Sequence, residues 1–172
     1  MTAGAVAQIA ARHKHRRSPL QRAVLTGVVL GVVSIYLASV GILLMIHGRA
    51  VIVDILTLGQ EALLAIALGA GAFVARSERT LSSVQVILHS ALAGAIASGL
   101  LAALALATDA FDLRSIFIAL SPQLLNMLTF DFDELPVGLA ILVGAGTVLA
   151  ALGALLSMAP RVVQRQIGRA HV

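Results

Sequence analysis

Two adjacent polar residues, Gln60 and Glu61, interrupt an otherwise apolar stretch over residues 55–75. A helix needs about 20 mostly apolar residues to cross a bilayer, and this stretch is long enough. A carboxylate roughly two turns inside such a helix is costly unless it faces protein or water, so Glu61 is a candidate for ion or proton coupling. The alternative, favoured by Asp54 and Thr57, is that Glu61 lies near the interface and reaches the headgroups.

His89 is the third polar candidate within an apolar segment, the predicted span over residues 84–107. It is either a proton carrier or a packed, hydrogen-bonded side chain, and the packed role is the commoner one. His13 and His15 are too isolated for a metal site. The sequence therefore predicts no metal site built on histidine.

Enzymatic chemistry is not expected, because no phosphate-binding loop, dinucleotide fingerprint, zinc-protease motif or nucleophile elbow occurs in the sequence. The chain has no Cys, which excludes a disulfide, a thiolate metal site and a cysteine nucleophile. Asp131, Asp133 and Glu134 could bind a cation, but flexible acidic loops usually only hold solvent. We expect no cofactor.

The composition is that of an integral membrane protein. Of 172 residues, 59% are hydrophobic and 12% are charged, against about 25% charged in soluble domains. The mean hydropathy is +1.00. Four apolar segments are long enough to span, which predicts an all-α bundle with spans at about residues 23–46, 55–75, 84–107 and 137–159. A short turn at 47–50 would make the first two spans antiparallel neighbours.

Small residues recur along these spans at the four-residue spacing that lets helix backbones approach closely. Two such stripes lie on the third span, one over Ser90, Gly94, Ser98 and Ala102 and one over Ala91, Ala95, Gly99 and Ala103. Both should face other helices. The glycines that we expect to pack helices together are Gly27, Gly31, Gly69, Gly94 and Gly144.

Residues 108–136 form an acidic connection with an amphipathic element at about 113–130. Ser121 and Pro122 are typical of an N-cap followed by proline at the first helical position. The pattern predicts two short helices lying at the membrane interface, with Leu124, Met127 and Leu128 on the apolar face. The alternative is one re-entrant or kinked element that dips into the bundle.

Basic residues predict the orientation of the bundle. Nine of them lie on the side of the N-terminal segment (residues 1–21), the loop after the second span and the C-terminal tail: Arg12, Lys14, Arg16, Arg17, Arg22, Arg76, Arg79, Arg161 and Arg165. Two lie on the other side, Arg49 and Arg114. The positive-inside rule then places both termini in the cytoplasm. The basic run abuts a span and has no interleaved aromatic residues, so its partners are membrane lipids and not nucleic acid.

Two stretches carry a family resemblance. Residues 57–75, TLGQEALLAIALGAGAFVA, resemble a segment of LivM-like permeases, the membrane subunits of branched-chain amino acid ABC transporters. The aligned positions are Leu58, Gly59, Gln60, Gly69 and Ala70, and the chain departs from the family where Leu63 and Leu64 replace an aromatic pair. The T-L-G-Q helix, the later S-P-x-L…L-T-F (121–130) and the P-R pair at 160–161 resemble an additional N-terminal membrane region of such permeases.

The resemblance implies a function without a catalytic site. The chain would be the N-terminal membrane segment of a bacterial inner-membrane importer permease, packing beside the transport core. Its implied partners are other permease subunits, a cytoplasmic ATPase and an external binding protein. Two other classes stay open: a free-standing small membrane scaffold or assembly protein, and an ion-coupled carrier that uses Glu61.

The C-terminal residues 161–172 are predicted to be a truncated cytoplasmic tail. The last six, 167–172, read like the translation of a common short-read sequencing adapter whose next codon in that frame is a stop. We therefore expect 167–172 to be non-native, residues 166–172 to pack against nothing, and the native protein to continue past Arg165 into further spans.

Overall fold

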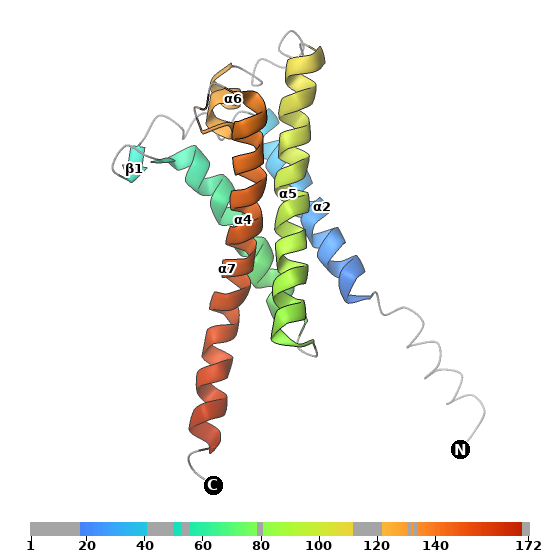
Figure 1. Cartoon of the computed structure of the whole chain (residues 1–172), viewed down its shortest axis with the longest axis vertical. Coiled ribbons are helices and arrows are strands. Elements are labelled where there is room, and N and C mark those ends of the chain that lie inside the picture. Colours follow the sequence, from blue (N-terminus) through green and yellow to red (C-terminus); the bar gives the residue numbers. More distant parts are fainter. Residues whose placement is uncertain are drawn as a thin grey trace, which may run out of the picture.

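The computed structural model is a bundle of long helices that alternate in direction along the chain (Figure 1). It describes residues 18–40, 50–52, 56–78, 81–111, 122–130, 132 and 134–169. The long helices are α2 (Pro19–Ser39), α4 (Leu58–Ser77), α5 (Ser83–Phe111) and α7 (Leu135–Arg169). Within the described residues, four helices are long and apolar enough to cross a membrane. The predicted all-α, four-span membrane bundle is confirmed.

Two of the spans begin with the same local device, a serine N-cap followed three residues later by glutamine. Ser18 Oγ accepts a hydrogen bond from the Gln21 N–H at 3.2 Å, and Gln21 Oε1 accepts one from the Ser18 N–H at 3.1 Å. Ser82 and Gln85 form the same reciprocal pair before α5, at 3.3 and 3.4 Å. These capping boxes satisfy N–H groups that a helix start leaves unpaired. Both helices therefore start before their predicted apolar spans.

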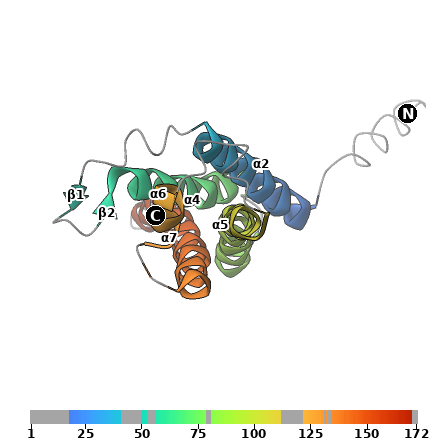
Figure 2. The same ribbon diagram turned by 90° about the horizontal axis from the view of Figure 1, so that it is seen from above.

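The helices pack as a ring in which α7 contacts both α4 and α5, and α5 contacts α2 (Figure 2). Because the direction alternates, α2 runs parallel to α5, and α4 runs parallel to α7. The first two spans are antiparallel, as predicted, but α2 packs mainly against α5 and touches α4 less. Chain neighbours are therefore not the main packing partners at this corner of the bundle.

The connection between the first two spans is described only in part, because residues 41–49 and 53–55 lie outside the described residues. Helix α2 covers Pro19–Ser39 and so begins before the predicted span over 23–46, whereas the predicted end of that span and most of the predicted turn at 47–50 lie outside the described residues. Strands β1 (Ala50–Ile52) and β2 (Leu56–Thr57) pair antiparallel before α4 begins. Hydropathy could not locate the helix end, because the apolar sequence continues past it.

The third and fourth spans extend beyond their apolar segments. Helix α5 runs four residues past the predicted end at Ala107, reaching Phe111. Helix α7 continues through Pro160 to Arg169, while the part of it that is apolar enough to span a membrane is Leu135–Ala159, which agrees with the predicted span over 137–159. The packing expected of residues 166–172 concerns side chains outside the described set.

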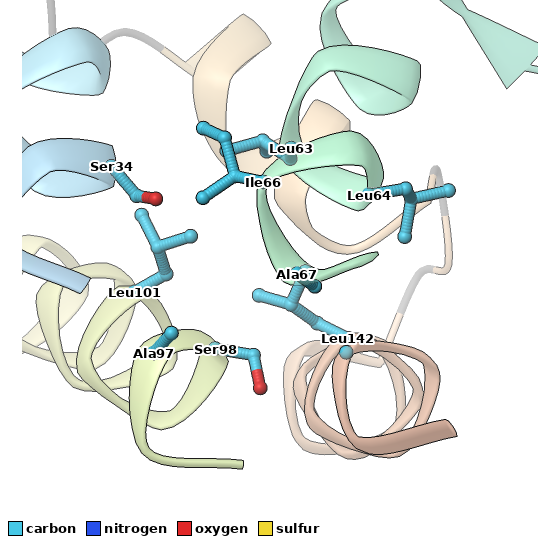
Figure 3. A pocket seen from close by; sticks show the side chains of 10 residues that line it. Ser34, Leu63, Leu64, Ile66, Ala67, Ala97, Ser98, Leu101 and Leu142 are labelled. Atoms are coloured by element: carbon cyan, nitrogen blue, oxygen red, sulfur yellow. The ribbon is translucent and has the colours of Figure 1, made fainter. Parts of the chain in front are cut away.

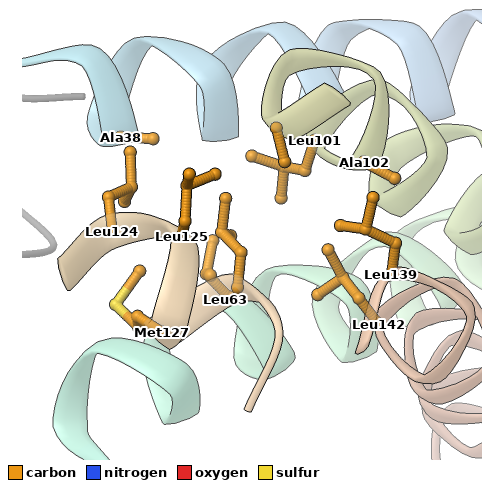
Figure 4. Packing of buried hydrophobic residues seen from close by; sticks show 11 residues of the cluster. Ala38, Leu63, Leu101, Ala102, Leu124, Leu125, Met127, Leu139 and Leu142 are labelled. Atoms are coloured by element: carbon orange, nitrogen blue, oxygen red, sulfur yellow. The ribbon is translucent and has the colours of Figure 1, made fainter. Parts of the chain in front are cut away.

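The short helix α6 (Pro122–Leu128) packs into the bundle at the end where α5 stops and α7 starts (Figure 1). Its Leu124, Met127 and Leu128 side chains are fully buried, in one cluster with Leu63 and Leu142 (Figure 4). The prediction that this apolar face lies on the membrane surface is therefore wrong. The proline start at Pro122 is confirmed, whereas the first predicted amphipathic helix and Ser121 lie outside the described residues.

The outward surfaces of the long helices are apolar, as lipid contact requires. Helix α2 is the least buried span, with 28% of its most apolar window buried against 44% for α4 and α5. Its exposed side chains include Val28, Val29, Val32 and Tyr36. Since large exposed apolar surfaces are unusual on soluble proteins, this surface agrees with a multi-pass membrane protein.

Candidate functional site

Gln60 ties the start of α4 to the end of α6. The residue is 3% exposed, and its Nε2 donates a hydrogen bond to the Met127 carbonyl oxygen at 3.1 Å. Met127 is at the C-terminal end of α6, where carbonyl groups lack partners within the helix. The chain turns there through Phe130, which has a φ of 55°, in the left-handed region. Gln60 therefore caps α6 from a helix 67 residues away in sequence.

Glu61 lies in the first turn of α4. The helix begins only at Leu58, because the preceding residues Leu56–Thr57 form strand β2. The prediction that this carboxylate lies two turns inside the span is wrong. A carboxylate near a helix N-terminus is favourable, since the unpaired N–H groups there carry partial positive charge. Glu61 is partly buried, and its Oε1 is buried without a hydrogen-bond partner among the described residues. It lies at the bundle end, as the interface alternative predicted, but protein covers one of its oxygens.

His89 is packed within the lower half of α5, on the side that faces α2. Ala93, one turn further along α5, lies against Gly27 of α2, and residues four apart share a helix face. His89 is partly buried, and its Nδ1 is buried without a hydrogen-bond partner in the described part of the chain. Partial burial agrees with the packed role, whereas the expected hydrogen bond of this nitrogen is not found among the described residues.

The acidic connection does not assemble a site among the described residues. Asp109 and Glu134 are exposed, while Asp131 and Asp133 lie outside the described set. The described residues contain no group of three or more His, Asp or Glu side chains that could hold a metal ion. The polar residues singled out in the sequence, Gln60, Glu61 and His89, lie on different helices or faces and do not converge.

Among the described residues, α4, α5 and α7 cross closely at a point built from small residues. A Cβ added at Gly71 of α4 would clash with the carbonyl of Ala150 of α7, and one added at Gly94 of α5 would clash with the Ala150 side chain. Ser90 Oγ donates a hydrogen bond to the Gly71 carbonyl oxygen at 3.2 Å. Small residues let backbones approach this closely, and a hydroxyl can then bond across helices.

Of the five glycines predicted to pack helices, three do so. Gly94 lies in the three-helix crossing, and Gly27 and Gly31 of α2 lie against Ala93 and Ala97 of α5. The prediction is wrong for Gly69 and Gly144, since no described atom lies within 4 Å of a Cβ added at either. Sequence reasoning missed the packing role of Gly71, whose face could not be known before its partner helix was placed.

The two small-residue stripes on α5 differ. Ser90, Gly94, Ser98 and Ala102 are all buried, as predicted. In the other stripe Ala103 is exposed, and no described atom lies within 4 Å of a Cβ added at Gly99. The prediction that both stripes face helices therefore holds only for the first. The face toward α2 instead uses Ala93 and Ala97.

A small void lies at the centre of the bundle, between all four long helices (Figure 3). Its volume is about 20 Å³, and its lining includes Ser34 of α2 and Ser98 of α5. Ser34 is 2% exposed, and the Ser98 hydroxyl donates to the Gly94 carbonyl oxygen at 2.8 Å. Because one water needs about 10–15 Å³, the void suits a single water and no larger solute.

An ion pair that the sequence did not predict joins the other end of the bundle. Arg22 Nη1 of α2 and Glu78 Oε1, just after α4, are 3.3 Å apart. The Glu78 side chain is 3% exposed and the Arg22 side chain is 32% exposed. The sequence alone places Arg22 among the basic residues of one side but does not pair it with Glu78, because two residues 56 positions apart carry no shared sequence pattern.

Neither a protein-family model, nor a curated protein, nor a solved structure matches this chain. Its own residues define its class, a multi-pass membrane protein whose buried polar side chains join helices to one another.

Proposed function

We propose that this chain is the N-terminal membrane region of an importer permease of the branched-chain amino acid ABC type, packing beside the transport core. The observation that carries the proposal is the close crossing of α4, α5 and α7, beside a central void of only about 20 Å³. An amino acid is much larger than the single water that such a void holds. The described part of the four long helices therefore supports a packing role beside the solute path.

The two stretches that resemble the permeases also meet in space. Gln60, from the T-L-G-Q segment, bonds to Met127, from the S-P-x-L…L-T-F segment, at 3.1 Å. Because this hydrogen bond joins α4 to α6, the two stretches depend on each other structurally, which is a physical reason for both to occur in one chain. Other permease subunits, a cytoplasmic ATPase and an external binding protein would then be partners of the whole transporter.

The proposed orientation has both termini in the cytoplasm of a bacterial inner membrane. It rests on the nine-to-two distribution of Lys and Arg between the two sides. Reporter fusions after Ala50 and after Asp109 are expected to report the outside. A cytoplasmic signal from either fusion would contradict the orientation.

The decisive experiment reads the gene beyond Arg165 in an independent genomic clone. Continuation into further spans, with uptake of a branched-chain amino acid that depends on the full frame, is the expected result. A clone that encodes residues 166–172 and then stops would contradict the permease proposal and favour the free-standing scaffold or assembly protein.

An ion-coupled carrier that uses Glu61 is the second candidate, favoured by the buried Oε1 without a partner among the described residues. Glu61 lies in the first turn of α4, near one end of the bundle. It is therefore too far from the middle of the span to bind an ion there. Glu61→Gln keeps the size of the side chain and removes its charge. A carrier would lose ion-dependent uptake in proteoliposomes, whereas a packing region would leave uptake by the full transporter unchanged.

A further inference from the structure

An apolar groove of about 470 Å³ runs along the outside of the bundle between α2 and α4. Leu25, Val29 and Leu30 of α2 form one wall, and Ile66 and Phe73 of α4 form the other. Thr26 is the one polar residue in its lining. The groove faces away from the core, since Val29 is 51% exposed and Phe73 is 62% exposed.

Gly69 gives the groove its depth. It lies on the α4 wall between Ile66 and Phe73, and no described atom lies within 4 Å of a Cβ added there. A larger residue at this position would fill the groove without pushing helices apart. The glycine therefore has no packing role within the described bundle, and its effect is to leave space beside α2.

Two arginines lie one helical turn beyond the groove lining, at the bundle end where α2 starts and α4 ends. Arg22 precedes Thr26 by one turn on α2, and Arg76 follows Phe73 by one turn on α4, so each shares a face with a groove residue. The ion pair of Arg22 with Glu78 brings these two helix ends together. Arg76 is exposed, and no ion pair of it with a described residue is observed. With one carboxylate against two guanidinium groups, the mouth carries a net positive charge.

We propose that this groove is a binding site for one anionic phospholipid, with an acyl chain along Gly69 and the phosphate at Arg76. The apolar walls fit a hydrocarbon chain, because they carry no charged group and Thr26 is the one polar residue in the lining. Basic sites between transmembrane helices are suited to anionic headgroups. The apolar walls bind an acyl chain, and the basic mouth favours an anionic headgroup. A zwitterionic lipid has the acyl chain but lacks the net negative charge.

The test uses the full chain reconstituted in nanodiscs of equal phosphatidylglycerol and phosphatidylcholine, then released into mild detergent for native mass spectrometry. The wild-type protein is expected to retain one lipid molecule, and that lipid should be phosphatidylglycerol more often than phosphatidylcholine. Gly69→Leu should lose that lipid. Gly144→Leu is the matched control, because position 144 on α7 is equally open and does not line this groove.

Arg76→Gln tests the headgroup separately from the chain. It should keep one bound lipid but lower the preference for phosphatidylglycerol about fivefold, the ratio equivalent to about 1 kcal/mol for one basic residue at the surface. Arg76→Lys should restore the preference. Unchanged melting temperatures would show that the Gly69→Leu and Gly144→Leu variants are folded.

Three results would overturn the proposal. They are equal lipid retention by Gly69→Leu and Gly144→Leu, equal retention of both lipids by the wild type, and a lipid-free dimer whose formation Gly69→Leu prevents. The last result would assign the groove to a second copy of this chain.

Discussion

Gly69 and Gly71 are two residues apart on α4, yet they have opposite environments. Gly71 lies against the backbone of Ala150, while Gly69 opens onto the outer groove beside α2. Residues two apart on a helix point about 200° away from each other, so one helix can serve both surfaces. The difference shows that the sequence of a glycine-rich span does not reveal which glycine packs against another helix and which faces an open groove.

The strongest test of this comparison is Gly71→Val with Gly69→Val as its matched control. The valine at position 71 would clash with the Ala150 carbonyl, so the helices would have to separate. We expect a loss of about 3 kcal/mol or more for Gly71→Val and a change within about 0.5 kcal/mol for Gly69→Val. Detergent unfolding followed by circular dichroism measures both. Equal losses would remove the distinction between the two faces.

The ion pair between Arg22 and Glu78 should make the next largest contribution to the free energy of unfolding. Glu78→Gln leaves Arg22 without its partner, but the one-third exposure of Arg22 lets it reach water. We therefore expect a loss of about 2 kcal/mol, below the roughly 3–5 kcal/mol of a fully buried pair. A double-mutant cycle with Arg22→Gln isolates the coupling. Strictly additive losses would mean that the pair contributes nothing to the α2–α4 contact.

The tether between α4 and α6 should have a smaller and more local effect. Gln60→Leu removes one of two donors to the buried Met127 carbonyl oxygen, because the Phe130 N–H also donates to it at 3.4 Å, so we expect a loss of about 1 kcal/mol. Hydrogen exchange should rise in residues 122–130 and stay unchanged at the α4–α7 crossing. Asn126→Leu, at an exposed position of α6, is the control. Faster exchange throughout the bundle would contradict a local role.

The hydroxyl in the crossing should have the smallest effect. Ser90→Ala removes the bond from α5 to the Gly71 carbonyl, and such bonds between membrane helices average about 0.6 kcal/mol. Ser98→Ala should lose less, because the Ser98 hydroxyl bonds within its own helix to Gly94. Detergent unfolding of the two variants side by side makes the comparison. A larger loss for Ser98→Ala than for Ser90→Ala would contradict the stabilising role of the hydrogen bond between α5 and α4.

Some starts and ends could have been predicted more closely from the sequence. The Ser18–Gln21 and Ser82–Gln85 pairs have the spacing of a capping box, which signals a helix start without any tertiary contact. The end of α2 had no such signal, because residues 40–46 are as apolar as the helix itself. Glu61 was placed too deep for the same reason, since the start of α4 follows a strand pair that hydropathy does not detect.

The sequence by itself determined the four spans and the all-α class, because crossing a bilayer requires long apolar segments whose backbone bonds close within each helix. Only the tertiary structure decided which residues meet. The burial of α6, the pairing of Arg22 with Glu78 and the choice of Gly71 over Gly69 all depend on how helices are placed around one another. Lipid and protein are equally apolar surroundings for a membrane helix, so hydrophobicity does not distinguish the two faces, and close packing does.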